Sequence, residues 1–306
     1  MIFQASQDRF DSGGETAEPE EQRFCVVCAT RQKVLEANRV RSNVRRFKHE
    51  SFLVWRCAGC RSLHAWDDVD LSRYYAGYPI FGAALDWRLR VVYDNMLARL
   101  RRAGLRSEHA LLDYGCGAGL LVQHLKNRGY ARASGYDRFA QGMDRRELLE
   151  DRYDAVVCQD VLEHVEDPID LLATIDRLVK SGGFVALGTP DADALDLMNH
   201  GQDVHALHQP YHRHILTADM LRAKGEALGW TVEHHYSTMF NNTLFPTMNP
   251  RFVLHYVKCH DDVFDLVAEP IKLSGWKIWS PATPFFALFG YFLDRHTDIM
   301  VIFRKP

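Results

Sequence analysis

The stretch Ala110–Gly119 places an acidic residue and closely spaced glycines directly after an apolar run. Its candidate ligand-facing residues are Asp113, Gly115, Gly117 and Gly119. Because glycine has no Cβ, alternating glycines let the backbone approach a ligand closely and adopt turns that other residues avoid. A helical pattern of apolar and polar residues begins at Leu120. The stretch therefore predicts a buried strand, a glycine turn and a helix start, which together present backbone amides at the edge of an α/β sheet.

The spacing of these glycines disfavours NAD or FAD as the ligand. A dinucleotide fingerprint, G-x-G-x-x-G, would place its third glycine where Leu120 stands. A second acidic residue, Asp137, ends a predicted strand at 132–136 and lies 18 residues after Gly119. An acidic residue near this spacing accepts ribose hydroxyls, because a carboxylate offers two acceptor oxygens. The alternative for Asp137 is a helix N-cap.

A further predicted strand, 153–159, is apolar and runs into a polar segment. Gln159 and Asp160 stand at its end, and Glu163 and His164 follow. His164 has an imidazole that could act as a base. A structural role is the alternative, and geometry must decide between the two. The 15 residues between Asp137 and this strand leave room for at most one short helix.

These motifs resemble those of a known family. The pattern Asp-x-Gly-x-Gly-x-Gly at 113–119 resembles motif I of class I S-adenosylmethionine (SAM) methyltransferases. The pattern Glu-His-Val-x-Asp-Pro at 163–168 resembles a segment of the ubiquinone-type and sugar methyltransferases of that family. A predicted helix at 169–179, the pair Gly182-Gly183 as its end, and a strand at 184–187 continue the pattern. The resemblance therefore spans about 110–190.

The resemblance implies a Rossmann-like α/β core with a mostly parallel sheet and an antiparallel last strand at 298–304. It places SAM across the carboxyl edge of the first strands, with the glycines near its methionine part and Asp137 on its ribose. Gln159 and Asp160 would lie beside the cofactor. Tyr78 would line the cofactor pocket or simply pack. The short segment after Asp137 departs from the family where adenine is often recognised.

Two Cys-x-x-Cys pairs precede this core, and 28 residues separate them: Cys25, Cys28, Cys57 and Cys60. Two such knuckles can complete a tetrahedral four-cysteine zinc site, the closed arrangement of structural zinc. With no export signal evident, metal binding explains them better than disulfides. The pairs also resemble the zinc-binding domain that begins a branch of the methyltransferase family. Two nearby histidines, His49 and His64, are expected to be ordinary surface residues.

The segment 200–214 is rich in histidine: His200, His205, His208, His212 and His214. Imidazole titrates near neutrality, so it suits general base work and metal ligation. The segment could be a substrate loop that supplies a base, hold a second metal through His208 and His212 at i, i+4 spacing, or contain scattered hydrogen-bonding residues. If one histidine is catalytic, His208 or His212 is favoured. Thr217 is expected to cap a helix at 218–228.

An aromatic insertion is predicted at 239–297. Its members include Trp276, Trp279, Pro281, Pro284, Phe285, Phe286, Phe289, Tyr291 and Phe292. The simpler interpretation is a cap packed on the sheet or a homodimer surface. The alternative is a hydrophobic lid that excludes water and accepts an apolar or lipid-like substrate.

Composition fits a globular protein of one or two domains. The 306 residues are 47% hydrophobic with a net charge of −3. No basic face indicates nucleic-acid binding, and the longest apolar run, around 284–293, is too short to span a bilayer. We expect a disordered leader at 1–22, a zinc ribbon at 23–70, a linking helical segment at 71–105 with its helix at 83–103, and a methyltransferase domain at 106–306. A cytoplasmic location is the default.

The predicted activity is methyl transfer from SAM to a small-molecule acceptor. O-methylation of a metabolite, sugar or lipid-like natural product fits best. C-methylation of a deoxysugar or another activated carbon is the alternative within enzymes, because the zinc-binding branch of the resembled family includes sugar C-methylating enzymes. A SAM-binding scaffold without turnover, carrying a zinc ribbon as an interaction module, is the alternative outside enzymes.

Overall fold

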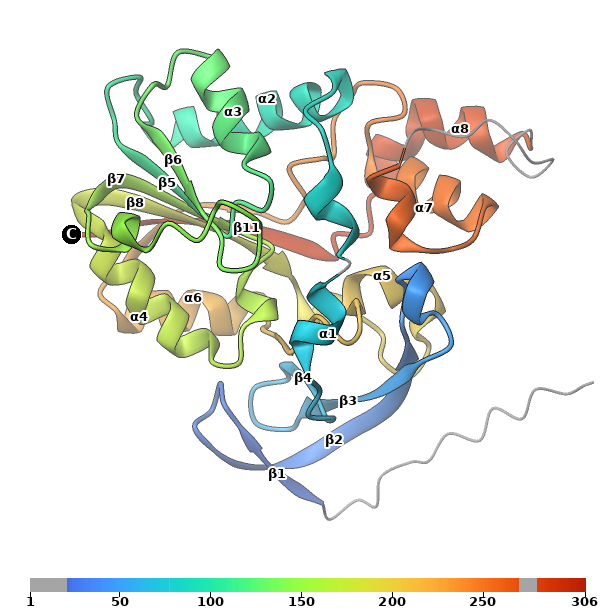
Figure 1. Cartoon of the computed structure of the whole chain (residues 1–306). Helices are drawn as coiled ribbons and strands as arrows, with labels where there is room; N and C mark the ends of the chain where they lie inside the picture. The colour runs from blue at the N-terminus through green and yellow to red at the C-terminus, as the bar shows by residue number, and fades with distance from the viewer. Residues whose placement is uncertain (1–20, 77, 270–279) are drawn as a thin grey trace, which may run out of the picture.

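The computed structural model describes residues 21–76, 78–269 and 280–306. Most of the expected leader at 1–22 lies outside the described residues, as do Trp276 and Trp279. The centre of the molecule is a six-stranded sheet in the order β10-β11-β8-β7-β5-β6 (Figure 1). Its strands are β5 (Leu111–Tyr114), β6 (Ala133–Tyr136), β7 (Tyr153–Gln159), β8 (Val179–Pro190), β10 (Thr231–Tyr236) and β11 (Asp298–Arg304).

The predicted Rossmann-like sheet is confirmed. Strands β6, β5, β7 and β8 pair in parallel. The last strand, β11, runs antiparallel to both β8 and β10. Since the parallel strands end together, their loops meet at one edge of the sheet, where α/β proteins bind ligands.

Helices cover both faces of this sheet (Figure 1). One face carries α2 (Trp87–Arg102) and α3 (Leu120–Asn127), and the other carries α4 (Pro168–Leu178) and α6 (Ala218–Ala227). Strand residues alternate between the two cores: Leu111 and Val157 pack with α2 and α3, whereas Leu112 and Val156 pack with α4 and α6. Because strand side chains point alternately to opposite faces, these near-continuous apolar strands are those of a sheet buried on both sides.

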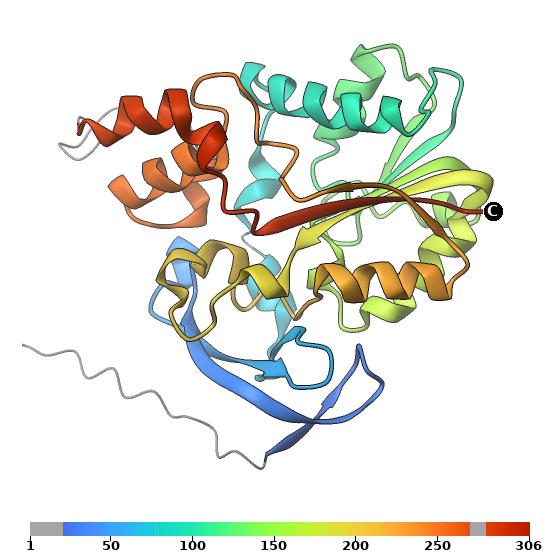
Figure 2. The same ribbon diagram turned by 180° about the vertical axis from the view of Figure 1, so that it is seen from behind.

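A second sheet contains the cysteine knuckles. Its order is β1 (Gln22–Cys25), β2 (Thr30–Arg41), β3 (Ser51–Cys57), β4 (Leu63–Ala65) and β9 (His214–Ile215). Strand β9 comes from the histidine-rich segment, so the N-terminal module shares a sheet with the rest of the chain (Figure 2).

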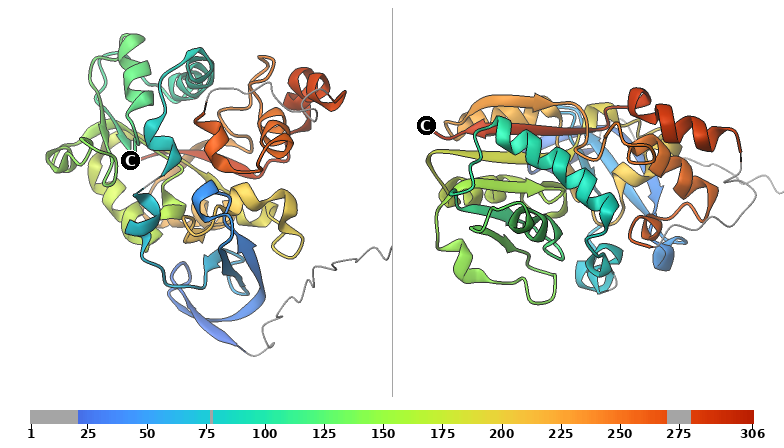
Figure 3. Two further views of the ribbon diagram at one scale, coloured as in Figure 1. Left: turned by 45° about the vertical axis from the view of Figure 1, so that its right-hand side comes forward. Right: turned by 90° about the horizontal axis from the view of Figure 1, so that it is seen from above.

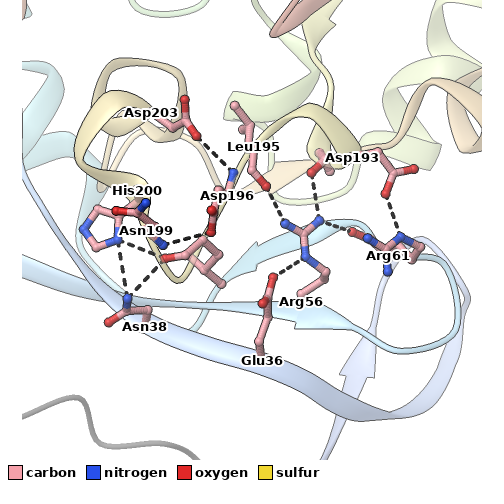
Figure 4. Close-up of polar contacts among 12 residues, drawn as sticks. Glu36, Asn38, Arg56, Arg61, Asp193, Leu195, Asp196, Asn199, His200 and Asp203 are labelled. Carbon is pink, nitrogen blue, oxygen red and sulfur yellow. Dashed lines mark hydrogen bonds and ion pairs between the residues drawn. The ribbon is translucent and has the colours of Figure 1, made fainter.

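Buried Arg56 reinforces this junction from β3. Its guanidinium donates to the carbonyl oxygens of Ala192 and Leu195, both at 2.8 Å, and pairs with Glu36 at 2.5 Å (Figure 4). The N-terminal module is therefore fixed to the segment that leaves the carboxyl end of β8.

The aromatic insertion lies at this same edge, because β11 begins at Asp298 opposite Pro190, the last residue of β8. It contains α7 (Pro250–Cys259), α8 (Ala282–Phe289) and the 3-10 turns η7 (Phe264–Val267) and η9 (Gly290–Leu293). Helices α7 and α8 pack together beyond the sheet (Figure 3). Phe285 and Phe289 of α8 are half exposed. Among the described residues, no helix is long and apolar enough to cross a membrane.

Several local predictions are confirmed. Thr217 caps α6 by accepting the N–H of Met220 at 3.2 Å. No strand follows Asp137 before β7, and the intervening segment holds only η3 (Arg146–Leu149). The expected helix at 83–103 begins later, at α2, because the Asp86 side chain caps it.

One prediction was wrong: Gly182-Gly183 does not end α4. That helix ends at Leu178, and the two glycines lie inside the longer strand β8. The short remaining elements are α1 (Leu71–Tyr75), α5 (Val204–Leu207), η1 (Arg45–Phe47), η2 (Pro79–Gly82), η4 (Leu162–His164), η5 (Ala192–Ala194) and η6 (His200–Gln202).

Candidate functional site

The glycine turn between β5 and α3 has the backbone that its sequence predicts. Gly115, Gly117 and Gly119 have φ values of +80°, +52° and +72°, which residues other than glycine rarely adopt. A Cβ on Gly115 would lie 2.1 Å from a methyl carbon of Val161, so packing excludes one there. A Cβ on Gly117 would meet no atom within 4 Å. Packing therefore explains Gly115, whereas Gly117 borders space that a ligand can use.

Asp137 at the end of β6 holds this turn. Its Oδ2 accepts the N–H of Gly117 at 2.9 Å, and its Oδ1 accepts the N–H groups of Phe139 and Ala140 at 2.8 Å each. No α-helix follows it, so the N-cap alternative does not describe this carboxylate. A carboxylate has about four acceptor positions. Three are used, which leaves one for a hydroxyl of a ligand.

Three further carboxyl groups lie at the same edge: Asp113 and Glu163 are buried, whereas Asp160 is exposed. Burial, with a smaller contribution from Asp137, raises the pKa of Asp113 to about 7. Partial desolvation by the surrounding protein raises the pKa of Asp160, which follows β7, to about 6. Burial and the nearby Asp160 hold the pKa of Glu163 well above its ordinary value. A cationic ligand would favour the charged form of these carboxyls.

Gln159 links β7 to this group. Its Nε2 donates to Asp160 Oδ1 at 2.8 Å, while its Oε1 is buried without a hydrogen-bond partner in the described part of the chain. A Cβ on Gly188 of β8 would lie 1.9 Å from that oxygen. The glycine in β8 thus makes room for Gln159 at the strand end.

His208, Tyr78 and their neighbours form a buried polar cluster beside these strand ends. The Tyr78 hydroxyl lies 3.1 Å from His208 Nε2, and His208 Nδ1 lies 2.7 Å from Asn43 Oδ1. Because an amide oxygen only accepts, His208 donates through Nδ1, and its neutral Nε2 accepts the Tyr78 proton. Burial, then the nearby His164 and His205, hold the pKa of His208 well below its ordinary value, so this imidazole is neutral.

His212 contacts different groups. Its Nδ1 donates to the carbonyl of Ala206 at 2.7 Å, which turns Nε2 toward Glu163 Oε1 at 3.9 Å. The ligand atoms of Glu163, His164 and His212 all lie within 4.8 Å of one another, close enough to hold a metal ion. In the part of the chain that the structure describes, the gathered group therefore includes His212 but not His208.

The remaining histidines of the segment have partners of their own. His200 bonds to the carbonyl of Leu197, and His205 to Asp262. His214 bonds to His64 and to the carbonyl of Glu166. Tyr75 also belongs to this polar cluster, because its hydroxyl lies 2.9 Å from His164 Nδ1.

Sequence relatives decide the family. A profile of the methyltransferase domain matches residues 87–235. The ubiquinone biosynthesis O-methyltransferase of Aeromonas salmonicida is 30% identical over 163 residues, which are 43% of this chain and 68% of that protein. This chain belongs to the SAM-dependent methyltransferases. The enzyme of the same name from Serratia proteamaculans is 33% identical over 112 residues, 29% of this methyltransferase and 46% of that protein.

The methyltransferase thus spans about half the length of several curated relatives that it matches. Among solved structures, a SAM dependent methyltransferase from Archaeoglobus fulgidus is similar over 70% of this chain and 94% of its own, with a TM-score of 0.40 and 18% identity.

The four cysteines of this methyltransferase come together at one point. Cys25 and Cys60 sulfurs lie 3.6 Å apart, Cys28 and Cys57 sulfurs 3.8 Å, and all four lie within 4.8 Å. The edge of a tetrahedron with Zn–S bonds of about 2.3 Å is roughly 3.8 Å. All four are free thiols, at separations too long for a disulfide. The geometry fits a zinc ion.

The expectation for His64 was wrong, whereas His49 is exposed as expected. His64 is 2% exposed, its Nε2 lies 3.3 Å from the Cys25 sulfur, and its Nδ1 lies 2.9 Å from His214 Nδ1. The spacing Cys60-x-x-x-His64 could have signalled this position. Asn43 carried no signal, because its partner His208 is 165 residues away in the chain.

Proposed function

We propose that this chain transfers the methyl group of SAM to an oxygen of a small-molecule acceptor. The observation that carries the proposal is the pair formed by the Gly117 amide and the Asp137 carboxylate at 2.9 Å, beside a position where a Cβ would meet no atom. In the proposed complex, Gly115, Gly117 and Gly119 bring the backbone to the methionine part of SAM. Asp137 accepts a ribose hydroxyl with its remaining acceptor position.

The carboxyls at the strand ends would serve the positive charges of SAM. Asp113 and Asp160 lie at the ends of β5 and β7 with raised pKa values near neutrality. A sulfonium and an ammonium group nearby would favour their charged forms, so that the buried Asp113 would not be left as an unpaired charge. Gln159 offers a buried, unpartnered carbonyl oxygen to a donor of the cofactor.

The acceptor proton would leave through Tyr78 and His208. The sulfonium methyl is already electrophilic, so the protein mainly aligns it for in-line attack by the acceptor oxygen. As that oxygen attacks, its proton passes to the Tyr78 oxygen while Tyr78 gives its own proton to His208 Nε2. Tyr78, expected beside the cofactor, then acts on the acceptor as well. His212 is the weaker candidate for this base, because its Nε2 faces Glu163.

Cys25, Cys28, Cys57 and Cys60 would hold one structural zinc ion. Four thiolates close the coordination sphere, so the ion would contribute to folding rather than to chemistry. Its position between the β1–β2 and β3–β4 turns would stabilise the sheet that ends in β9.

The proposed class of methyl acceptor rests on two features. The matching relatives are named O-methyltransferases of ubiquinone biosynthesis, which favours oxygen as the methylated atom. Exposed apolar side chains of the insertion, such as Phe285 and Phe292, fit a lid over a lipid-like acceptor. Cytoplasmic location and a homodimer remain predictions.

Isothermal titration calorimetry tests cofactor binding at the glycine turn and Asp137. S-adenosylhomocysteine (SAH) should bind the full chain, and Asp137→Ala should weaken it, whereas Asp144→Ala, on the same segment, should not. Turnover with a panel of hydroxylated acceptors, followed by mass and NMR analysis of products, then separates O-methylation from C-methylation. SAH binding without turnover across the panel would instead favour the scaffold alternative.

A further inference from the structure

Asn43 is a fully buried side chain that joins three distant parts of the molecule. It follows β2 in the N-terminal module and is 0% exposed. Its side chain contacts His208 and His205 of the histidine-rich segment, at 2.7 Å and 3.0 Å. Its backbone carbonyl accepts the N–H of Phe264, in the insertion, at 2.6 Å. The side chain that faces His208 Nδ1 therefore comes from outside the methyltransferase core.

The hydrogen bonds around Asn43 run in one direction, and an ionised carboxylate sets that direction. Asp262 forms an ion pair with Arg41. Burial would raise the pKa of this carboxyl, but the hydrogen bond from His205 and the charge of Arg41 lower it below its ordinary value. A carboxylate only accepts, so His205 donates to it through Nε2 at 3.1 Å. With that proton on Nε2, His205 Nδ1 faces the Asn43 amide nitrogen at 3.0 Å and accepts a hydrogen bond from it, because an amide NH₂ only donates.

The same reasoning continues inward. Because His205 Nδ1 accepts, the Asn43 amide group must point its NH₂ at His205 and its oxygen at His208. That oxygen can only receive a hydrogen, so His208 carries its proton on Nδ1. Its Nε2 is left with a free lone pair directed at the Tyr78 hydroxyl.

We propose that Asn43, His205 and Asp262 are positioning residues that hold His208 in the tautomer whose Nε2 accepts a proton. The inference rests on the proposed role of His208 as the base that acts through Tyr78. In the opposite tautomer, Nε2 would present a hydrogen to Tyr78 and could accept nothing. The N-terminal cysteine module thus completes the acceptor side of the active site through Asn43.

The test measures the tautomer directly on the full chain labelled with ¹⁵N-histidine and saturated with SAH, by two-bond ¹H–¹⁵N correlation. In the unmodified protein, His208 should carry its proton on Nδ1. One hydrogen bond contributes about 1 kcal/mol, so Asn43→Leu and Asp262→Ala should each lower the ratio of the two tautomers about fivefold. Asn43→Asp keeps an acceptor facing Nδ1 and should retain the original tautomer.

Matched controls lie close by. Asn38, on β2, donates to the carbonyl of Leu197 and lies 3.4 Å from His200 Nδ1 (Figure 4). Asn38→Leu should leave the His208 signals unchanged, and so should Asp261→Ala, next to Asp262. Should Asn43→Leu fail to fold, Asp262→Ala decides, because Asp262 is partly exposed.

Two results would overturn the proposal: a proton on His208 Nε2 in the unmodified protein, or an unchanged ratio in both Asn43→Leu and Asp262→Ala. SAH titration of each variant keeps this separate from the activity proposal. If the unmodified chain does not bind SAH, the proposed methyltransferase mechanism is refuted. The His208 tautomer can then be measured without SAH and still tests the positioning network.

Discussion

Replacing Gly117 by alanine should separate the cofactor role of the glycine turn from its structural role. Both Gly117 and Gly129 have positive φ values, +52° and +92°, and neither would bring a Cβ within 4 Å of another atom. Each alanine substitution therefore adds only backbone strain, of about 1 kcal/mol. For a chain of this length we expect each to lower the melting temperature by about 2 °C.

Only the Gly117→Ala Cβ would occupy space next to the Asp137 carboxylate, where we place SAM. Forcing an extra carbon into a packed contact costs about 1–3 kcal/mol, so SAH should bind on the order of 5- to 150-fold more weakly. Gly129→Ala should bind SAH as the unmodified chain does. The assays are differential scanning fluorimetry for stability and calorimetric titration for affinity.

Gly115→Ala gives a contrasting outcome. Its Cβ would lie 2.1 Å from a Val161 methyl carbon, so overpacking adds to the strain, and stability should fall by about 2–5 kcal/mol.

If Gly117→Ala binds SAH with unchanged affinity, the turn is not the cofactor-binding site and the reasoning from its glycine spacing fails.

Three further predictions concern other parts of the molecule. Cys57→Ser should lose about one equivalent of zinc by elemental analysis and lower the melting temperature of the whole chain, since the cysteine sheet includes β9; Cys259→Ser should retain the metal. Because burial raises the pKa of Asp113 to about 7, the folded state holds its proton more tightly than the unfolded state. That contribution is present at low pH and lost as pH rises through about 7, so urea titrations of Asp113→Asn should show a flatter stability profile, by up to roughly 4 kcal/mol between about pH 4 and pH 8. Arg56→Met should destabilise the chain by about 3 kcal/mol, because it removes charged hydrogen bonds to two carbonyls; a loss under about 0.5 kcal/mol would contradict this.

The fold could be predicted from the sequence because its signals are local. Apolar runs ending in acidic residues or glycine mark strand ends, and the helices between them carry one apolar face. The mostly parallel sheet with an antiparallel last strand followed from the family resemblance, whereas the order of the strands came from the structure. The end of α4 was misjudged, because a glycine pair ends a helix or bends a strand equally well, and pairing of β8 with β7 and β11 selected the strand.

The candidate site divides in the same way. The sequence placed the glycine turn and Asp137 after successive strands, and the structure pairs those strands and joins the two groups by a hydrogen bond. The partners of the histidines were out of reach, since each one depends on a contact between distant segments. His64 was expected at the surface, yet the pairing of β4 with β9 buries it between Cys25 and His214.

By itself, the sequence determined a class I methyltransferase core and a cluster of four cysteines, because each rests on residues whose spacing along the chain imposes their geometry. Only the tertiary structure decided which histidine faces Tyr78, and that Asn43 of the N-terminal module holds it. The direction of a buried hydrogen bond is set by the group at its far end. Here that group is Asp262, which folding alone brings to His205.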